Sequence, residues 1–318
     1  MARRQQPRSK SVVSLEAAMV ARRYFLDDKQ KNEIAEEFGI SRFKVARLLE
    51  EARASGIVRI SVDMPSEVDL PLGEELARKF GIRRVIAART LDEDPTLVAA
   101  ITGAAAAQYL STAVGADDVL GISWGRSLTY AVDAVTHQSS TDIVQLVGGL
   151  RAGALDISGV ELVRRLSEKT GGDAFPLHAP LLVRTPTMAQ ELRDDPSLQD
   201  AIGRFSSLTV AAVGIGSWVP PKSTLYSEFT EPERAELLGF GAVADICGFV
   251  LDREGRPIVS DALDRAVGIS AEELRRVPEV IAIAGGEEKT GAIIAGLNSG
   301  IVNTLITDSI TASRLLAS

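Results

Sequence analysis

Short apolar segments that are followed closely by glycine recur through most of this chain, and they limit the possible folds more than any other feature. They cover residues 119–123, 143–147, 208–213 and 280–284, followed by Gly125, Gly148, Gly149, Gly214, Gly216, Gly285 and Gly286. Stretches with helical spacing of apolar residues separate them. Buried strands that alternate with helices are typical of a mostly parallel sheet covered on both faces. We therefore predict a doubly wound α/β fold.

Two more strands and five helices complete this prediction. The strands are expected at 84–88 and 304–307, and the helices at 72–80, 96–114, 127–135, 160–170 and about 289–297. Ligands of such sheets bind beyond the carboxyl ends of the strands. Because glycine follows four of the predicted strands, we expect these four strand ends to form one crevice.

The segment GISWGRSL predicts an anion-binding turn between a strand and a helix. Small residues let backbone N–H groups approach an anion, and a helix N-terminus favours negative charge. Arg126 and Ser127 add side-chain donors, and Lys289 can neutralise a second side of the anion. Ordinary glycine turns and solvated lysines give the same patterns without a ligand. The spacing matches neither a P-loop nor a dinucleotide-binding motif.

The N-terminal segment differs from the remainder in charge. Residues 1–60 hold 13 Lys and Arg against 8 Asp and Glu, a net charge of +5, whereas the remainder carries −13. Helices are predicted at 15–26, at 31–38 and from Ser41, as N-cap, to about 55. Gly39 is expected to supply the sharp turn between the second and third helices. This is the pattern of a helix-turn-helix, with a winged-helix-like strand after it.

The third helix is predicted to read DNA. Its apolar positions Val45, Leu48, Leu49 and Ala52 share one side, which leaves the other side free for a duplex. The candidate contacts to phosphates and base edges are Ser41, Arg42, Phe43, Lys44 and Arg47. Arg3, Arg4, Arg8 and Lys10 form a candidate arm along the phosphates. A three-helix protein–protein module with a solvated basic face is the alternative.

Composition predicts a cytoplasmic protein. Neither an apolar run of membrane-spanning length nor a signal core is found. A single cysteine, Cys247, cannot form an internal disulfide, and we interpret it as a small buried residue rather than a reactive one. The Pro-containing segment 64–72 predicts a boundary between a DNA-binding domain, 1–63, and a ligand-binding and oligomerisation domain, 64–318.

Several motifs in order resemble the SorC (SorC/DeoR-type) family of sugar-binding transcriptional regulators over almost the whole chain. They are NEIAEEFGISRFKVARLLEEARASGIVRISV, VLGISWGRSL, IVQLVGG, VAAVGIG, GAVADICGFVLDREG and VIAIAGGEEKTGAIIAGLNSGIVNTLITD. The resemblance implies a C-terminal domain similar to sugar-phosphate isomerases, a phosphorylated sugar or polyol as effector, double-stranded operator DNA as partner, and a homotetramer or dimer.

The resemblance also implies roles for individual residues. Gly125, Arg126 and Ser127 match the phosphate-holding loop of the family, and Gly148 and Gly149 match its second glycine loop. Asp245 matches an acidic position that faces sugar hydroxyls, and Lys289 a basic position near the phosphate. Arg126 is bulkier than the small hydroxyl residue that some members have in this turn.

The sequence favours a regulator over an enzyme. Asp245 and Lys289 can supply the base and the electrophile of a sugar-phosphate isomerase, so an isomerase- or deaminase-like enzyme is the alternative. His137 and His178 show no motif spacing, and neither a metal cluster nor a cofactor motif is found. A free-standing isomerase has no use for a helix-turn-helix. The glycines at the strand ends argue against a purely structural scaffold.

Overall fold

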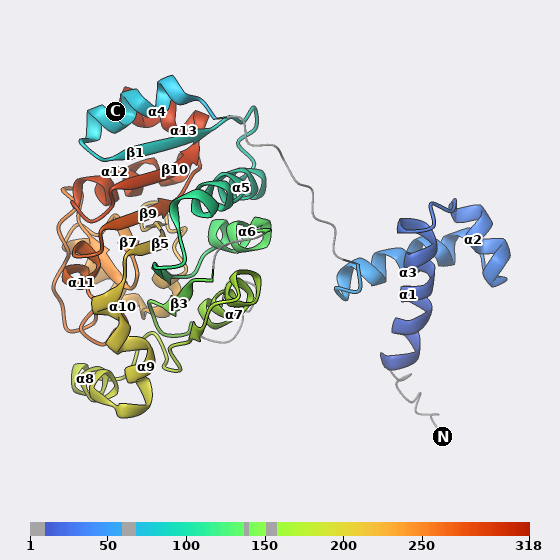
Figure 1. Ribbon diagram of the computed structural model, residues 1–318, viewed down its shortest axis with the longest axis horizontal. Coiled ribbons are helices and arrows are strands. Elements are labelled where there is room, and N and C mark those ends of the chain that lie inside the picture. The colour runs from blue at the N-terminus through green and yellow to red at the C-terminus, as the bar shows by residue number, and fades with distance from the viewer. Residues whose placement is uncertain (1–9, 59–67, 137–139, 151–157) are drawn as a thin grey trace. The chain divides into compact units, whose positions relative to one another are not determined.

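The computed structural model describes residues 10–58, 68–136, 140–150 and 158–318, and the side chains from residue 15 onward within these ranges. The chain divides into two compact units, Met1–Asp63 and Met64–Ser318. We call them the N-terminal unit and the body. Figure 1 shows both. In the described part of the chain, no helix has the length and apolar character needed to cross a membrane.

The N-terminal unit contains three helices, α1 (Lys10–Phe25), α2 (Lys31–Phe38) and α3 (Arg42–Ala54). Their shared core is formed by Ala17, Val20, Ala21, Ile34, Val45, Leu48, Leu49 and Ala52. The predicted inward side of α3 is therefore confirmed. Of the predicted basic arm, Arg3, Arg4 and Arg8 lie outside the described residues, as does the strand expected after α3, whereas Lys10 is the first residue of helix α1 and not part of an extended arm.

The turn between α2 and α3 has the predicted chemistry. Gly39 has φ +63°, in the left-handed region that glycine adopts without strain, and its N–H caps the end of α2. Ser41 then caps α3, because its Oγ accepts a hydrogen bond from the backbone N–H of Lys44 at 3.2 Å. These two residues set the angle at which α3 leaves α2.

The body is built around a seven-stranded parallel sheet with the order β1-β10-β9-β5-β2-β3-β4. Its strands are β1 (Arg84–Ala88), β2 (Val119–Ile122), β3 (Asp142–Gln145), β4 (Ala174–Phe175), β5 (Val210–Gly214), β9 (Glu279–Ile283) and β10 (Thr304–Asp308). All the strands predicted for the body are present, with bounds that differ by up to two residues. β4 was not predicted, because two residues, of which Ala174 is exposed and Phe175 partly buried, leave no apolar run.

Helices cover both faces of this sheet. The helices described in the body are α4 (Leu70–Phe80), α5 (Pro95–Ala113), α6 (Arg126–Ala134), α7 (Gly159–Thr170), α8 (Pro186–Asp194), α9 (Gln199–Ile202), α10 (Glu231–Gly239), α11 (Ala271–Arg275), α12 (Thr290–Asn298) and α13 (Ser309–Ala317). Figure 1 shows α5, α6 and α7 on one face, with α10, α11 and α12 on the other.

Side chains that alternate along the central strands contribute to the two hydrophobic cores, one on each face of the sheet. Val210 and Ala212 of β5 belong to the buried cluster on the α5–α6–α7 side, whereas Ala211 and Val213 belong to the cluster on the opposite side. Successive side chains of a strand point to opposite faces, so a fully buried strand must be apolar throughout. This explains why the continuous apolar runs identified the strands.

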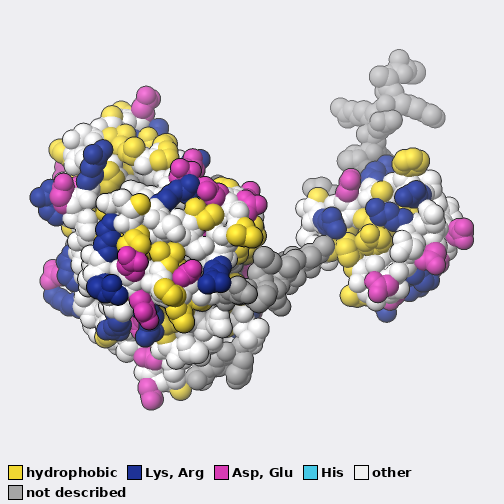
Figure 2. Space-filling view, turned by 90° about the horizontal axis from the view of Figure 1, so that it is seen from above, with side chains coloured by type: hydrophobic (Ala, Val, Ile, Leu, Met, Phe, Trp, Pro, Cys, Tyr) yellow, Lys and Arg dark blue, Asp and Glu magenta, His cyan; other side chains and the backbone are white. Residues whose placement is uncertain are grey.

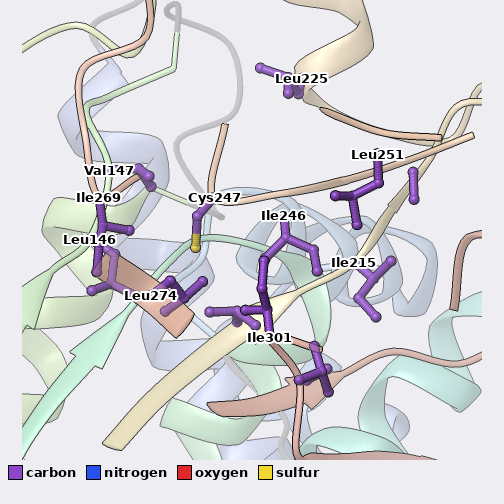
Figure 3. Close-up of a cluster of buried hydrophobic side chains, with 14 of the residues drawn as sticks. Leu146, Val147, Ile215, Leu225, Ile246, Cys247, Leu251, Ile269, Leu274 and Ile301 are labelled. Carbon is purple, nitrogen blue, oxygen red and sulfur yellow. The ribbon is translucent and has the colours of Figure 1, made fainter. Parts of the chain in front are cut away.

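A smaller antiparallel sheet lies beside the main one, with the order β6-β7-β8. Its strands are β6 (Gly216–Ser217), β7 (Ala244–Ile246) and β8 (Phe249–Leu251), none of which was predicted. Ile215, Ile246 and Cys247 join a buried cluster with Leu146 and Leu274 (Figure 3). This packing fixes the small sheet against the main sheet and thereby positions the residues of β6 and β7.

Close packing also positions the start of α6. A Cβ added at Gly103 of α5 would lie 2.8 Å from the carbonyl oxygen of Ser127 and 2.5 Å from the Cβ of Tyr130. Because real Cβ atoms do not approach so closely, only glycine lets α5 and α6 touch there. The first turn of α6 is therefore set by a helix–helix contact.

Candidate functional site

A cavity of about 590 Å³ opens at the carboxyl ends of β2, β5 and β9. It is lined by residues 123–128 after β2, 214–216 after β5, and 283 and 285–289 after β9. Residues 222–224, Asp245, Cys247, Glu93, Pro95 and Ala99 complete the wall. Three of the four glycine-bearing strand ends therefore meet in one cavity.

The strand order accounts for the position of this cavity. From β2 the chain moves to β3 and β4, and from β5 it moves the other way to β9 and β10. The loops after β2 and β5 consequently diverge, and a crevice is left between these two adjacent strands. The cavity lies where the general rule for open α/β sheets places a ligand.

The amino end of α6 forms one wall. Its N-cap, Gly125, has φ +144° and no side chain, so the first turn is not covered by a side-chain cap. The first N–H groups of a helix have no partner within the helix, and its dipole is positive there. Arg126 and Ser127 follow directly. This wall therefore favours an anionic group.

The glycine turn after β9 is held by hydrogen bonds to the end of β10 and the start of α13. The backbone N–H of Gly286 donates to Asp308 Oδ2 at 3.1 Å and to Thr311 Oγ1 at 2.7 Å. A Cβ at Gly285 would lie 2.4 Å from the same carboxylate oxygen. Asp308 is buried and does not line the cavity, so these contacts fix the glycine turn on the side away from the cavity.

Lys289 follows this turn directly and also lines the cavity. Its Nζ donates a hydrogen bond to the carbonyl oxygen of Ile215, 2.9 Å away. Burial, with a smaller contribution from the nearby Arg126, lowers the pKa of Lys289 to about 8. Lys289 ends a 3₁₀ turn, Glu287–Lys289, and forms the N-cap of α12, whereas the sequence predicted that it begins the helix.

Asp245 contributes a buried carboxylate from β7. Its Oδ2 accepts a hydrogen bond from the indole N–H of Trp218 at 3.0 Å, and Ser223 also bonds to the carboxylate. Burial raises the pKa of Asp245 to about 6, although these bonds and Lys289 act in the opposite direction. The carboxylate is therefore mostly ionised at neutral pH.

Most charges at the rim are already paired. Lys222 lies 3.0 Å from Glu288, and Arg314 lies 3.1 Å from Glu93. Arg126 is exposed and makes no ion pair within the described part of the chain. Because Lys222 and Arg314 are paired with these acids, the guanidinium of Arg126 and the ammonium of Lys289 are the cations available to an incoming anion.

Cys247 lines the cavity in a constrained backbone conformation. It lies with Gly248 in the two-residue turn between β7 and β8 and has φ +49°. Burial raises the pKa of the thiol, and the Ser123 hydroxyl bonds to it. The thiol therefore stays protonated at neutral pH, in agreement with its interpretation as a small buried residue.

Two predicted site residues lie elsewhere. Gly148 and Gly149 are not among the residues that line the cavity. A Cβ at Gly148 would lie 2.6 Å from the backbone of Pro180, and the N–H of Gly149 bonds to the carbonyl oxygen of Ala179. These glycines allow the chain after β3 to pass close to a neighbouring backbone. Gly125, Arg126, Ser127, Asp245 and Lys289 do share the cavity.

The sequence did not indicate Trp124, Lys222 or Ser223 as cavity residues. Trp124 stands inside the GISWGRSL motif and could have been included with its neighbours. Lys222 and Ser223 stand in a polar loop after two prolines, where no periodicity or motif points to a site. His178 is exposed, and His137 lies outside the described residues. The described residues contain no group of three metal-ligating side chains.

The exposed side of α3 forms a second candidate site. Ser41, Arg42, Phe43 and Arg47 are exposed, and Phe43 is 89% accessible. Lys44 is partly buried and pairs with Glu16 of α1 at 2.6 Å. Figure 2 shows Lys and Arg side chains gathered beside hydrophobic ones on one face of this unit. A cationic surface with an exposed aromatic ring suits a duplex that offers phosphates and thymine methyls.

Comparison with known proteins decides the family. The model of the family described as "putative sugar-binding domain" matches residues 65–317. The chain belongs to the SorC-type sugar-binding transcriptional regulators. The full-length sorbitol operon regulator SorC from Klebsiella pneumoniae has the same fold, with a TM-score of 0.73 and 25% identity over 96% of this chain and 100% of that one.

Curated relatives that are named as regulators match this chain over nearly their whole length. The transcriptional regulator LsrR of Enterobacter sp. strain 638 is 30% identical over 307 residues, which is 94% of this chain and 92% of the relative. The deoxyribonucleoside regulator of Bacillus subtilis is 28% identical over 313 residues, 97% of this chain and 98% of the relative. Because both matches cover more than nine-tenths of this chain, both extend into the N-terminal unit.

Proposed function

We propose that this SorC-type regulator binds operator DNA through a helix-turn-helix in the N-terminal unit, residues 1–63. A phosphorylated sugar or polyol bound in the body, residues 64–318, would control it. The observation that carries the proposal is the cavity that unites the α6 N-terminus, Arg126 and Lys289 with the carboxylate of Asp245. The α6 N-terminus and Arg126 suit an anion, and the carboxylate of Asp245 suits hydroxyl groups. Such a protein would act in the cytoplasm.

The phosphate of the effector is assigned to the anion-binding wall of the cavity. Gly125, Arg126 and Ser127 offer backbone and side-chain donors at a helix N-terminus, where a phosphate is stabilised without a counter-ion. The net charge of the body is negative, so attraction of the phosphate depends on these local donors. The effector's hydroxyl groups are assigned to Asp245, an acceptor when ionised.

The DNA contacts are assigned to the exposed side of α3. Arg42 and Arg47 are proposed to reach phosphates or guanine edges, Phe43 a thymine methyl, and Ser41 a phosphate next to the cap. Lys44 is proposed to contact a phosphate by exchanging its bond to Glu16 for one to the duplex. The basic charge of residues 1–60 supports this assignment.

The effector signal is proposed to pass between copies of the chain. In a dimer or tetramer, two recognition helices must match half-sites about one helical turn, or a multiple of it, apart. An effector that changes the packing of the bodies changes this spacing, and therefore the affinity for the operator. An effector that only rigidifies the body is the other possibility; it would leave the spacing preference unaltered.

Direct binding experiments test the proposal. Duplexes bound by the purified protein would be selected from a random-sequence pool, and their affinity measured with and without a panel of phosphorylated sugars and polyols. We expect at least one compound to change the affinity and to raise the melting temperature of the body by mass action. Absence of both effects across the panel would contradict the sensing role.

An enzymatic role is the second candidate, because Asp245 and Lys289 lie in one cavity with pKa values of about 6 and 8. These values suit a general base and acid near neutral pH. The regulator names of the relatives favour binding without turnover. Measurable conversion of an aldose or ketose phosphate by the purified protein would support the enzymatic role over the regulatory one.

A further inference from the structure

Asp245 is surrounded by groups that donate hydrogen bonds to it. Trp218 Nε1 lies 3.0 Å from Asp245 Oδ2, and the Ser223 hydroxyl bonds to the same carboxylate. Trp218 is 1% exposed, so its N–H has no access to solvent as an alternative partner. An indole N–H can only donate. Trp218 therefore requires an acceptor at this position.

Ser223 is restricted in the same direction. Its Oγ accepts hydrogen bonds from the backbone N–H of Leu225 at 3.0 Å and of Tyr226 at 3.4 Å. A hydroxyl oxygen has two acceptor sites and one proton. Because both acceptor sites are used, the proton of Ser223 is left for Asp245. Both neighbours thus stabilise an ionised carboxylate.

The backbone around Asp245 is shaped for this arrangement. A Cβ at Gly216 would lie 2.2 Å from Asp245 Oδ2 and 2.6 Å from Ser223 Oγ, so only glycine leaves room for the bonded pair. The ring of Trp218 is held edge-on by Tyr226, with centroids 5.1 Å apart, and also contacts Phe229. The indole therefore has a fixed orientation, and its N–H has a fixed target.

We propose that Trp218 and Ser223 are positioning residues that hold Asp245 as an acceptor-only contact, so that the cavity selects a phosphorylated ligand that presents a hydroxyl group there. Selection among phosphorylated ligands rests on the function proposed above, whereas the positioning does not. A ligand with a carboxylate at this end is rejected, because it places a second negative charge against Asp245 and offers no proton. A site built around a buried polar contact discriminates strongly against ligands that lack the matching group.

Other charged groups face Asp245 from neighbouring elements. Lys289 of the turn before α12 interacts with Asp245, and Arg126 of α6 interacts with Lys289 in turn. Cys247 follows on the hairpin and stays a neutral thiol at neutral pH. Below pH 8, Lys289 is charged, so Asp245 is the group that titrates near pH 6.

The first experiment needs no ligand. In a Trp124→Phe background, Trp218 is the sole tryptophan, and its fluorescence reports the charge on the carboxylate to which it bonds. Between pH 4.5 and 8 we expect a transition near pH 6 that is absent in Asp245→Asn. Ser223→Ala should move it upward by about one pH unit, because the ionised form loses a donor.

Ser223→Thr is the matched control, since it keeps the hydroxyl. It should return the transition to the pH of the parent, which a purely structural role of the side chain would not require. Circular dichroism and the urea midpoint would establish that each variant is folded. A transition that stays in place in Ser223→Ala, or that persists in Asp245→Asn, would overturn the positioning role.

The second experiment tests the selection by calorimetry with two matched ligands, glucitol 6-phosphate and 6-phosphogluconate, against inorganic phosphate. They differ in a hydroxyl or a carboxylate at the end opposite the phosphate. We expect at least tenfold tighter binding of the hydroxyl compound, and loss of this preference in Asp245→Asn. Equal or reversed affinities would overturn the selection. If neither binds more tightly than inorganic phosphate, the proposed effector class is contradicted, while the titration still decides the positioning.

Discussion

The guanidinium of Arg314 lies 3.1 Å from both carboxylate oxygens of Glu93 and thereby joins α13 to the loop before α5. It also lies 3.5 Å from Glu287. Both acids line the cavity, so one cation on a helix outside the cavity connects two sides of its mouth.

Replacing Arg314 with Gln should loosen this rim. We expect a loss of about 1 kcal/mol in the free energy of unfolding, because the paired side chains are partly exposed and such pairs contribute little individually. Urea denaturation measures this. Arg256→Gln removes a pair with Asp252 and Glu254 away from the cavity and serves as the control. We expect a smaller loss from Arg256→Gln, because Arg256 is more exposed than Arg314, and an equal loss of unfolding free energy in both variants would refute a special role for Arg314.

The stability of the body should depend on pH through Asp245. Its pKa is raised by burial, so the folded state binds more protons than the unfolded state between pH 4 and 6, and stability falls as pH rises through this range. Relative to Asp245→Asn, the wild type should gain about 1 kcal/mol between pH 7 and 5. Urea titrations of both proteins at these two pH values measure the difference, and a constant difference would speak against the buried charge.

Lys289→Ala should leave operator binding intact without effector and blunt the response to it. The ammonium is proposed to neutralise the phosphate, and it is lost as pH rises through about 8. Effector affinity of the wild type should therefore fall between pH 7 and 9, and that of the variant should change less. Calorimetry at both pH values measures this. Loss of operator binding by the variant would indicate a structural role instead.

Arg47→Ala should weaken operator binding by about 1–3 kcal/mol if the side chain contacts a base. Arg47 is exposed on α3, so the stability of the unit should not change. Arg78→Ala, an exposed arginine of α4 in the body, is a matched control that should bind DNA normally. Fluorescence anisotropy on a selected duplex would test both, and unchanged affinity in Arg47→Ala would remove this residue from the interface.

Two glycines of the body should respond oppositely to alanine. Gly171 ends α7 with φ +77°, so alanine there should cost about 1 kcal/mol in stability. Gly291 lies within α12 with open space around its Cα, so alanine should stabilise by up to about 1 kcal/mol. Urea midpoints of the two variants compare them directly, and a shift in the same direction for both would be evidence against this backbone argument.

Most of the strands that sequence analysis located are buried along nearly their whole length, whereas the edge strand β1 begins with the exposed Arg84. The run predicted at 208–213 overlaps β5, because residues 210–213 are buried in the middle of the sheet and a strand covered on both faces must be apolar at such positions. The strands β6 and β7 were missed, since two or three residues give no periodicity, yet they carry Gly216 and position Asp245. Short elements depend on tertiary contacts, which the sequence does not display.

The candidate site shows the same division. Gly125, Arg126 and Ser127 were found because a strand, a tight turn and a helix follow one another locally. Gly148 carries the same local signal but approaches the backbone of Pro180, and only the three-dimensional path of the chain distinguishes these two uses of glycine. Trp218 and Ser223 meet Asp245 across loops, so no local pattern could have indicated them.

The pairing of β1 with β10, in which Arg84 stands opposite Thr304, has a consequence for biosynthesis. The ribosome completes the three helices of the N-terminal unit long before it makes β10, whereas the sheet of the body lacks an inner strand until then. Domains fold as units during translation, the N-terminal ones first. A nascent chain therefore acquires its proposed DNA-reading module while it is still unable to respond to any metabolite.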